Sequence, residues 1–479
     1  MTPATRLTAA GFVATAIAFG PARMGFGLFL PAFRTEFALT TSTAGMIASG
    51  GFLAFLGALL VSAWVGKRFG ERVSVTVGAL AAAVGFTAVA LAGDGFLLAV
   101  GIALAGTSAG LCWAPFNDAA ERVVAEDARA TALSVVSTGT TFGVAAAALL
   151  ALGVTQGVLD WRGAFIGFAL GALVLAAIVR LGLTSSRGRN SARRAVDEIV
   201  HVGMPAKLTH DQSAETVAAT AAAKARLTQR AAIPLYVTAL VFGMTNAIFL
   251  SFAADRVVGA GGLPGLANEV ASVVIFLGYA VFGTLGLATG RIEARYGLAP
   301  LFCFIFSAAT ASLLLIALAP TSWISVIAGS GLHGAAIMMV SAVFSFWSVR
   351  LFPGRSTLGF TATLLAMAAG SVLGPTVAGL LAAAQGPVVM FLVAAVAPLA
   401  VAVWFGLKLN QPRPRLPRQH DRVASFLAPH RHRDASRRRG AGGREQRCQR
   451  RGRQQRKVAR HDKRQIGIGH AGEAEGDAA

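Results

Sequence analysis

The chain contains few charged residues for its length. Charged residues make up 14% of the 479 residues, hydrophobic residues make up 55%, and the mean hydropathy is +0.62. Soluble domains carry about 25% charged residues, so this composition excludes an ordinary soluble protein. It indicates an integral membrane protein.

Cysteines are few, and residue patterns typical of catalytic sites are absent from the sequence. The three cysteines, Cys112, Cys303 and Cys448, have neither paired-disulfide nor metal-ligand spacing. The sequence also contains no Walker A loop, metal-ligand cluster or nucleophile–base pattern. We therefore expect no enzymatic chemistry, no pumping driven by nucleotide hydrolysis, and no cofactor or metal.

Acidic residues are absent from the middle of every long apolar segment. Asp94, Asp118, Asp160, Asp255 and Glu269 all fall near the ends of such segments. A proton relay based on carboxylates, or a carboxylate trap for organic cations, is therefore poorly supported.

Apolar runs long enough to cross a bilayer as a helix occur twelve times. The first six cover approximately 8–33, 42–65, 73–92, 96–118, 129–153 and 163–183, and the second six cover 232–255, 267–289, 298–319, 323–349, 356–383 and 386–408. The polar stretch between the two sets, with "SSRGRNSARR", is typical of a mobile linker. We predict an all-α membrane protein with an N-terminal bundle over 1–183, a linker over 184–231 and a C-terminal bundle over 232–408.

Basic residues are concentrated in the loops after the even-numbered spans, where Lys67, Arg68, Arg291 and Arg350 occur. The excess of Lys and Arg marks the cytoplasmic side of a membrane protein. We therefore expect a multi-pass protein of the bacterial inner (cytoplasmic) membrane, with both termini and the linker in the cytoplasm.

The basic tail over 409–479 has almost no apolar periodicity, so we predict that it is disordered. One interpretation is contact with anionic lipid headgroups. Aromatic residues are not interleaved with its arginines, which argues against a nucleic-acid partner. The interpretation we favour is that the tail has no function, for example as an out-of-frame extension of the gene.

Three short similarities relate the two sets of spans. "VGKRFGER" after span 2 matches "IEARYG" after span 8, "FGPAR" in span 1 resembles "FGMTN" in span 7, and "GTTFGV" in span 5 resembles "GSVLGP" in span 11. The aligned pairs are Gly70 with Gly297, Arg23 with Asn246, Gly139 with Gly370, and Gly143 with Gly374. The similar offsets indicate one internal duplication, as in a large class of secondary transporters.

The loops after spans 2 and 8 resemble the G-x-x-x-D-R-x-G-R-R motif of major facilitator superfamily (MFS) transporters. The copies here are "AWVGKRFGER" and "GRIEARYGLA". The first copy has Ala63 for the opening Gly, Lys67 at the Asp position and Glu71 at an Arg position. The second copy keeps Gly290, Arg295 and Gly297, and its acidic residue, Glu293, lies one residue before the Asp position. The resemblance covers Leu7 to Lys408 and implies two pseudo-symmetric six-helix bundles. Within the superfamily, the stretch beginning "GPARMGFGLFLPAF" is similar to the YbfB-like branch.

The charges of these loops suggest latches at the cytoplasmic ends of the spans. Glu293 is placed to pair with Arg350, and Lys67 with Asp118 or Glu121, as a latch of swapped charge in the first half. The alternative is that these are simply solvated loop charges.

Arg23 stands in the middle of the first apolar run, and its nearest acidic residue in the sequence is Glu36. It lies about 23 Å along that helix, slightly past the midplane. A charge at this depth costs about 2.5–3.5 kcal/mol on insertion scales, so it usually faces a bundle interior or a water-filled cavity. We predict contact with a ligand; the alternative is a snorkelling or carbonyl-bonded arginine.

The resemblance implies that spans 1, 4, 7 and 10 line a central cavity. His333 in span 10 is the only histidine within a predicted span; it is interpreted either as a buried imidazole bonded to a carbonyl or as a substrate or proton-coupling site. The other candidates are Thr107, Ser108, Trp113 and Asn117 in span 4, and Thr245 and Asn246 in span 7. The alternative for each is a hydrogen bond between helices.

The prediction for function is a monomeric secondary transporter that moves a small solute, with proton coupling left open. A lone arginine at the midplane favours a small organic anion or a polar metabolite. Multidrug-type efflux is the first alternative, weakened because span 5 lacks the Pro of the G-P-x-x-G-G antiporter motif. A membrane sensor that keeps the fold but moves nothing is the second.

Overall fold

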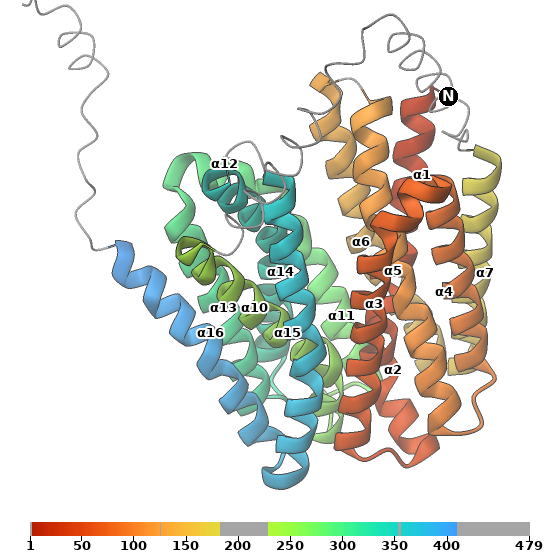
Figure 1. Ribbon diagram of the computed structural model, residues 1–479. Coiled ribbons are helices and arrows are strands. Elements are labelled where there is room, and N and C mark those ends of the chain that lie inside the picture. The colour runs from red at the N-terminus through yellow and green to blue at the C-terminus, as the bar shows by residue number, and fades with distance from the viewer. Residues whose placement is uncertain (1, 125, 183–228, 353–355, 410–479) are drawn as a thin grey trace, which may run out of the picture. The chain divides into compact units, whose positions relative to one another are not determined.

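The computed structural model describes residues 2–124, 126–182, 229–352 and 356–409, which are almost entirely helical (Figure 1). Residues 1–411 form one compact unit. The tail beyond residue 409 and nearly all of the predicted linker lie outside the described residues. The predicted division at residues 183 and 232 therefore stays a prediction.

The first half of the chain forms six spans from seven helices. These are α1 (Pro3–Phe19), α2 (Pro21–Phe37), α3 (Thr41–Phe69), α4 (Glu71–Ala90), α5 (Gly95–Val123), α6 (Glu126–Thr155) and α7 (Trp161–Gly182). The second half also forms six spans. Its elements are η1 (Arg230–Ala232), α10 (Ile233–Gly259), α11 (Val270–Gly283), η2 (Thr284–Ala288), α12 (Thr289–Tyr296), α13 (Leu298–Leu318), α14 (Trp323–Leu351), α15 (Ser356–Gln385) and α16 (Pro387–Leu409).

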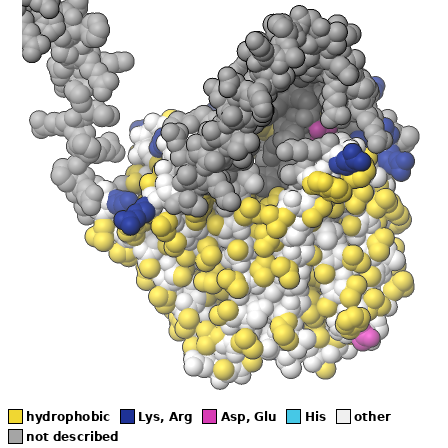
Figure 2. Space-filling model, in the orientation of Figure 1, with side chains coloured by type: hydrophobic (Ala, Val, Ile, Leu, Met, Phe, Trp, Pro, Cys, Tyr) yellow, Lys and Arg dark blue, Asp and Glu magenta, His cyan; other side chains and the backbone are white. Residues whose placement is uncertain are grey.

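Twelve of the described segments are long and apolar enough to cross a membrane, and each coincides with a predicted span to within a few residues. No strand occurs in the described ranges. The outer surface carries large apolar side chains such as Phe96, which is 79% exposed, and Ile324, which is 81% exposed. Figure 2 shows apolar side chains over most of the visible face, with Lys and Arg gathered towards one end. The prediction of a twelve-span all-α membrane protein is confirmed.

The first span differs from the continuous helix expected over 8–33, because it is interrupted at Gly20 between α1 and α2. Pro21 has no backbone N–H, and its ring disfavours a helical conformation at the residue before it. Gly20 therefore leaves the helical region, with φ −78° and ψ −104°. The interruption lies three residues before Arg23 and sets α2 as a separate helix that carries this arginine.

The internal duplication is visible in the backbone. Gly70 and Gly297 both have a φ of +86°, a left-handed value that favours glycine, at the starts of α4 and α13. Gly143 of α6 contacts the backbone of α1 at Ala16, and its counterpart Gly374 of α15 contacts the backbone of α10 at Met244. Equivalent glycines therefore make equivalent helix contacts in the two halves.

We expect Gly143→Ala to destabilise the N-terminal half. A Cβ at Gly143 would lie 2.0 Å from the carbonyl oxygen of Ala16, so α1 and α6 would have to separate. Overpacking of this kind costs about 1–3 kcal/mol. The measurement is the thermal unfolding midpoint in detergent, with Gly57→Ala as the control because nothing lies within 4 Å of a Cβ there. Equal midpoints for the two variants would contradict the expectation.

The most extensive contacts between the two halves are made by three helix pairs. These are α2 with α10, α3 with α15, and α6 with α11. Each pair joins one helix of the first half to one of the second, so a movement of one half relative to the other must change these contacts.

Candidate functional site

A cavity of about 620 Å³ lies between the two halves. Helices α2, α3 and α6 of the first half and α10, α11, α14 and α15 of the second contribute to its walls. Arg23 and Leu250 lie at its inner part, whereas Ser134, Gly290 and Ser345 line the part near the loop motifs. We call this second region the loop-motif end.

Arg23 is the only charged residue among the described residues that line this cavity. Its guanidinium carbon lies 4.9, 5.4 and 5.6 Å from the ring centroids of Phe55, Phe52 and Phe19. Such rings attract a cation through their quadrupoles but leave its charge unneutralised. Within the described part of the chain, no salt bridge involves Arg23. The site therefore holds a stabilised cation without a described counter-ion.

On its other side, Arg23 contacts a much smaller pocket of about 20 Å³, which is also lined by Gly27, Leu250 and Ser251. Arg23 and Leu250 line both spaces, so they separate the large cavity from the small pocket. Beyond the small pocket the two halves are in direct backbone contact.

Close contacts between the halves involve Gly27, Arg34, Gly45 and Ser49 of the first half and Leu250, Asp255, Pro375 and Thr376 of the second; we call this region the closed end. A Cβ on Gly27 would lie 1.7 Å from the carbonyl oxygen of Leu250, and one on Gly45 would lie 2.3 Å from that of Pro375. Only glycine lets backbones approach this closely.

Polar contacts also join α3 to α15 at the closed end. The backbone N–H of Thr376 donates to Ser49 Oγ at 3.0 Å, and the Thr376 hydroxyl makes a second contact with the same oxygen at 2.8 Å. Thr376 follows Pro375, which disturbs the helical ladder of α15 locally. Ser49 thus contacts both the backbone and the side chain of the opposite half.

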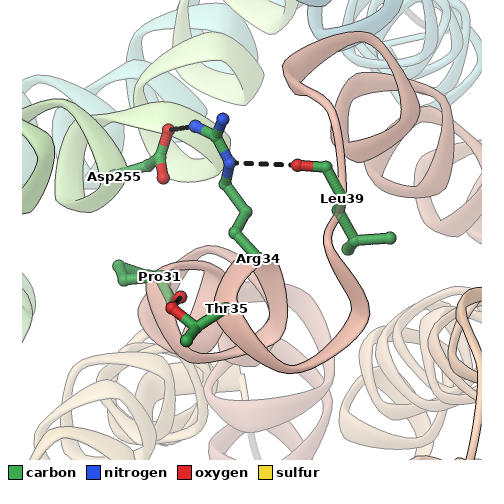
Figure 3. Close-up of polar contacts among 5 residues, drawn as sticks. All are labelled: Pro31, Arg34, Thr35, Leu39 and Asp255. Atoms are coloured by element: carbon green, nitrogen blue, oxygen red, sulfur yellow. Dashed lines mark hydrogen bonds and ion pairs between the residues drawn. The ribbon is translucent and has the colours of Figure 1, made fainter.

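An ion pair between α2 and α10 completes the closed end (Figure 3). Arg34 Nη1 lies 2.6 Å from Asp255 Oδ2, and Arg34 Nε donates to the carbonyl oxygen of Leu39 at 3.2 Å. In the same view, Thr35 donates to the carbonyl of Pro31 within α2. The sequence placed Asp255 near the end of a span but gave no signal that it pairs with Arg34.

Two buried side chains in the cavity wall each have a polar atom without a hydrogen-bond partner among the described residues. Asn246 is 2% exposed and its Oδ1 is unpaired, and Tyr279 is fully buried with an unpaired hydroxyl. Both line the cavity. The sequence proposed Asn246 as the counterpart of Arg23, and the structure brings both residues to one cavity. The sequence analysis missed Tyr279, whose only signal is a phenol within an apolar span.

Hydroxyl groups form much of the remaining polar wall. Five of them come from α6, at Ser134, Ser137, Thr138, Thr140 and Thr141, and two come from α14, at Ser341 and Ser345. Sequence reasoning missed these residues as well. Their spacing of three or four residues, which places side chains on one helix face, is the signal that could have found them.

His333 is fully buried next to the cavity rather than in its wall. Its ring stacks on Phe249, with centroids 4.0 Å apart and planes inclined by 9°. Neither ring nitrogen has a hydrogen-bond partner among the described residues. The carbonyl bond considered from the sequence is therefore not formed among the described residues, and His333 does not line the cavity; its role as a substrate or proton-coupling site stays a prediction.

The Major Facilitator Superfamily model matches residues 11–298 of the sequence, which is more than half of the chain. This chain belongs to the Major Facilitator Superfamily. Its family and its twelve-span fold identify a secondary transporter rather than an enzyme. Comparison with curated proteins finds no match.

Solved structures of other transporters share the fold of this transporter. The nucleoside transporter NupG aligns with a TM-score of 0.65 at 13% identity, covering 86% of this chain and 100% of that chain. The xylose transporter XylE from E. coli, in a partially occluded inward open conformation, aligns at 0.62 and 14%, covering 86% and 100%. The peptide transporter POT, in complex with sulfate, aligns at 0.63 and 15%, covering 85% and 94%. At these identities the similarity shows the fold alone.

The loop motifs of the transporter differ in how much of them the structure describes. Glu293 of α12 pairs with Arg350 of α14, as the sequence suggested for the second copy. In the first copy Arg68 is exposed, and the side chains of Lys67, Asp118 and Glu121 lie outside the described part of the chain. The swapped latch therefore stays a prediction.

Three of the remaining candidates of spans 4 and 7 do not line the cavity. The hydroxyls of Thr107, Ser108 and Thr245 donate to carbonyls of their own helices, at Leu104, Ala105 and Val241. None of the three lines the cavity of the transporter. The side chains of Trp113 and Asn117 lie outside the described part of the chain.

Proposed function

We propose that this transporter moves a small organic anion or a polar metabolite by alternating access to a site at Arg23. The observation that carries the proposal is the isolated positive charge in the cavity wall. Arg23 is surrounded by aromatic rings rather than acidic residues, so its N–H groups remain available to an oxyanion. Charge-assisted bonds of this kind are about twice as strong as neutral ones.

The distribution of open and closed regions supports alternating access. The cavity leads from Arg23 towards the loop-motif end, and the opposite end is closed by contacts between the halves. The excess of basic residues in the loops supports a cytoplasmic location for the loop-motif end. We infer an inward-facing state in the bacterial cytoplasmic membrane, with both termini on the cytoplasmic side, and rocking of the halves to expose Arg23 on the other side.

Three finer points belong to the same proposal and rest on the sequence. The "GPARMGFGLFLPAF" stretch supports membership of the YbfB-like branch. We take the functional unit to be a monomer. Coupling to protons is in keeping with the superfamily, and it would have to use groups other than carboxylates in the described cavity wall.

The test is thermal stabilisation of the full-length protein by organic anions, neutral metabolites and lipophilic cations, with wild type and Arg23→Ala compared. A ligand that binds only the folded state raises the unfolding midpoint by mass action. We expect an anion to stabilise the wild type, and its affinity to fall about 10–150-fold in Arg23→Ala, because the mutation removes hydrogen bonds to a charged group.

Two outcomes would contradict the proposal. Equal stabilisation of both proteins by lipophilic cations alone would favour efflux of lipophilic compounds. Binding of an anion without its accumulation in proteoliposomes would favour a sensor that keeps the fold. Arg23→Lys separates charge from geometry, because it keeps the positive charge but loses the planar fork of donors.

A further inference from the structure

Two residues of the cavity wall, Asn246 and Tyr279, each carry a buried polar atom without a partner. In proteins most buried polar side-chain atoms have a hydrogen-bond partner. Here Asn246 Oδ1 and the Tyr279 hydroxyl have none among the described residues, although both side chains are almost fully buried. Both residues line the cavity, but these two atoms have almost no exposed surface, so a ligand reaches them only when the side chains turn towards the cavity.

The position of Asn246 relative to Arg23 follows from the internal duplication. Arg23 lies on α2 in the first half, Asn246 lies at the equivalent place on α10 in the second, and both line one cavity. A solute bound between the halves therefore meets a cation from one half and an amide from the other. Tyr279, on α11, lies in the same wall.

The two groups require different chemistry from the solute. A guanidinium only donates hydrogen bonds, so it takes an anionic oxygen, whereas an amide oxygen only accepts them. The two ends of the amide are almost equal in shape, so a half-turn can present Oδ1 to the cavity, and Nδ2 then takes the buried position in which Oδ1 has no partner. An ammonium is disfavoured as the donor, since no described residue of the cavity wall is acidic. A neutral hydroxyl remains.

We propose that the substrate is a hydroxycarboxylate, whose carboxylate binds Arg23 and whose hydroxyl donates a hydrogen bond to Asn246 Oδ1. This inference rests on the proposed function, since it names the substrate class of the same site.

The experiment compares carboxylates that differ by hydroxyl groups. Binding of glycolate and acetate, lactate and propionate, and gluconate and hexanoate is measured on the full-length protein by isothermal calorimetry. We expect the hydroxylated member of at least one pair to bind about tenfold more tightly to the wild type, the factor given by one net hydrogen bond. In Asn246→Leu, which has similar volume, this ratio falls to about one while the affinity for the unsubstituted acid is kept.

The control variant is Ser312→Ala. Ser312 also has a buried, unpaired hydroxyl, but it lies on α13 and does not line the cavity, so its removal should leave the tenfold preference intact. Arg23→Ala should weaken both members of each pair. If carboxylates bind through Arg23 without preference for the hydroxyl, or if Asn246→Leu keeps that preference, this inference is wrong and the proposed function stands. If none of the carboxylates binds, this inference is wrong, whereas the proposed function is decided separately by the wider panel of anions, neutral metabolites and cations.

Discussion

Gly27→Ala is expected to reduce transport at least about tenfold, whereas Gly25→Ala, two residues earlier on α2, should transport normally. A Cβ at Gly27 would lie 1.7 Å from the carbonyl oxygen of Leu250 in the other half, but one at Gly25 would lie 3.6 Å from the Phe165 ring, an ordinary contact. Overpacking costs about 1–3 kcal/mol or more when the neighbour is backbone. The penalty raises the free energy of only the conformation in which the two halves touch at the closed end.

The conformational origin of this effect is measurable by cysteine labelling at Ser251, which lines the small pocket behind Arg23 and is 3% exposed. With the native cysteines replaced, Ser251→Cys should react slowly with a polar maleimide in purified protein and much faster when Gly27→Ala is added. Normal transport by Gly27→Ala, or labelling unchanged from Gly25→Ala, would show that the contact with Leu250 does not control closure.

Asp255→Asn is expected to shift the protein away from the conformation seen here and to lower transport about 5–30-fold. In the wild type, Asp255 Oδ2 lies 2.6 Å from Arg34 Nη1 and the Asp255 side chain is 16% exposed. The variant removes this charge partner of Arg34. Breaking a buried ion pair costs about 3–5 kcal/mol. Because Arg34 is 35% exposed, we expect about 1–2 kcal/mol here.

Exchange of the two charges tests whether the pair itself matters. Transport should be largely restored in the double variant Arg34→Asp with Asp255→Arg, since the attraction between α2 and α10 is re-formed. The control is Glu36→Gln, which breaks the pair with Arg162 at 3.0 Å; both of those residues belong to the first half, so the balance between conformations should not change. Equal losses in Asp255→Asn and Glu36→Gln would point to general destabilisation.

The sequence determined the architecture because hydropathy is a local property of a segment. Twenty or so consecutive apolar residues must form a membrane-spanning helix whatever they pack against. The duplication was also visible in the sequence, because glycine occupies both members of each pair where the two halves need it. Gly70 and Gly297 have the same left-handed backbone, and Gly143 and Gly374 make the same helix contact. Arg23 stood out for the same local reason, as a charge too deep in an apolar run to reach water along its own helix.

Tertiary structure alone decided which residues act together. Arg34 and Asp255 are separated by 221 residues, and Ser49 and Thr376 by 327, so no periodicity of one helix reports their contact. His333 and Asn246 looked alike as polar residues in apolar spans, yet Asn246 lines the cavity and His333 is stacked behind it on Phe249. The rotation of each helix about its axis and the docking of the two halves set these differences. Both depend on packing between segments, which composition and spacing along one segment do not encode.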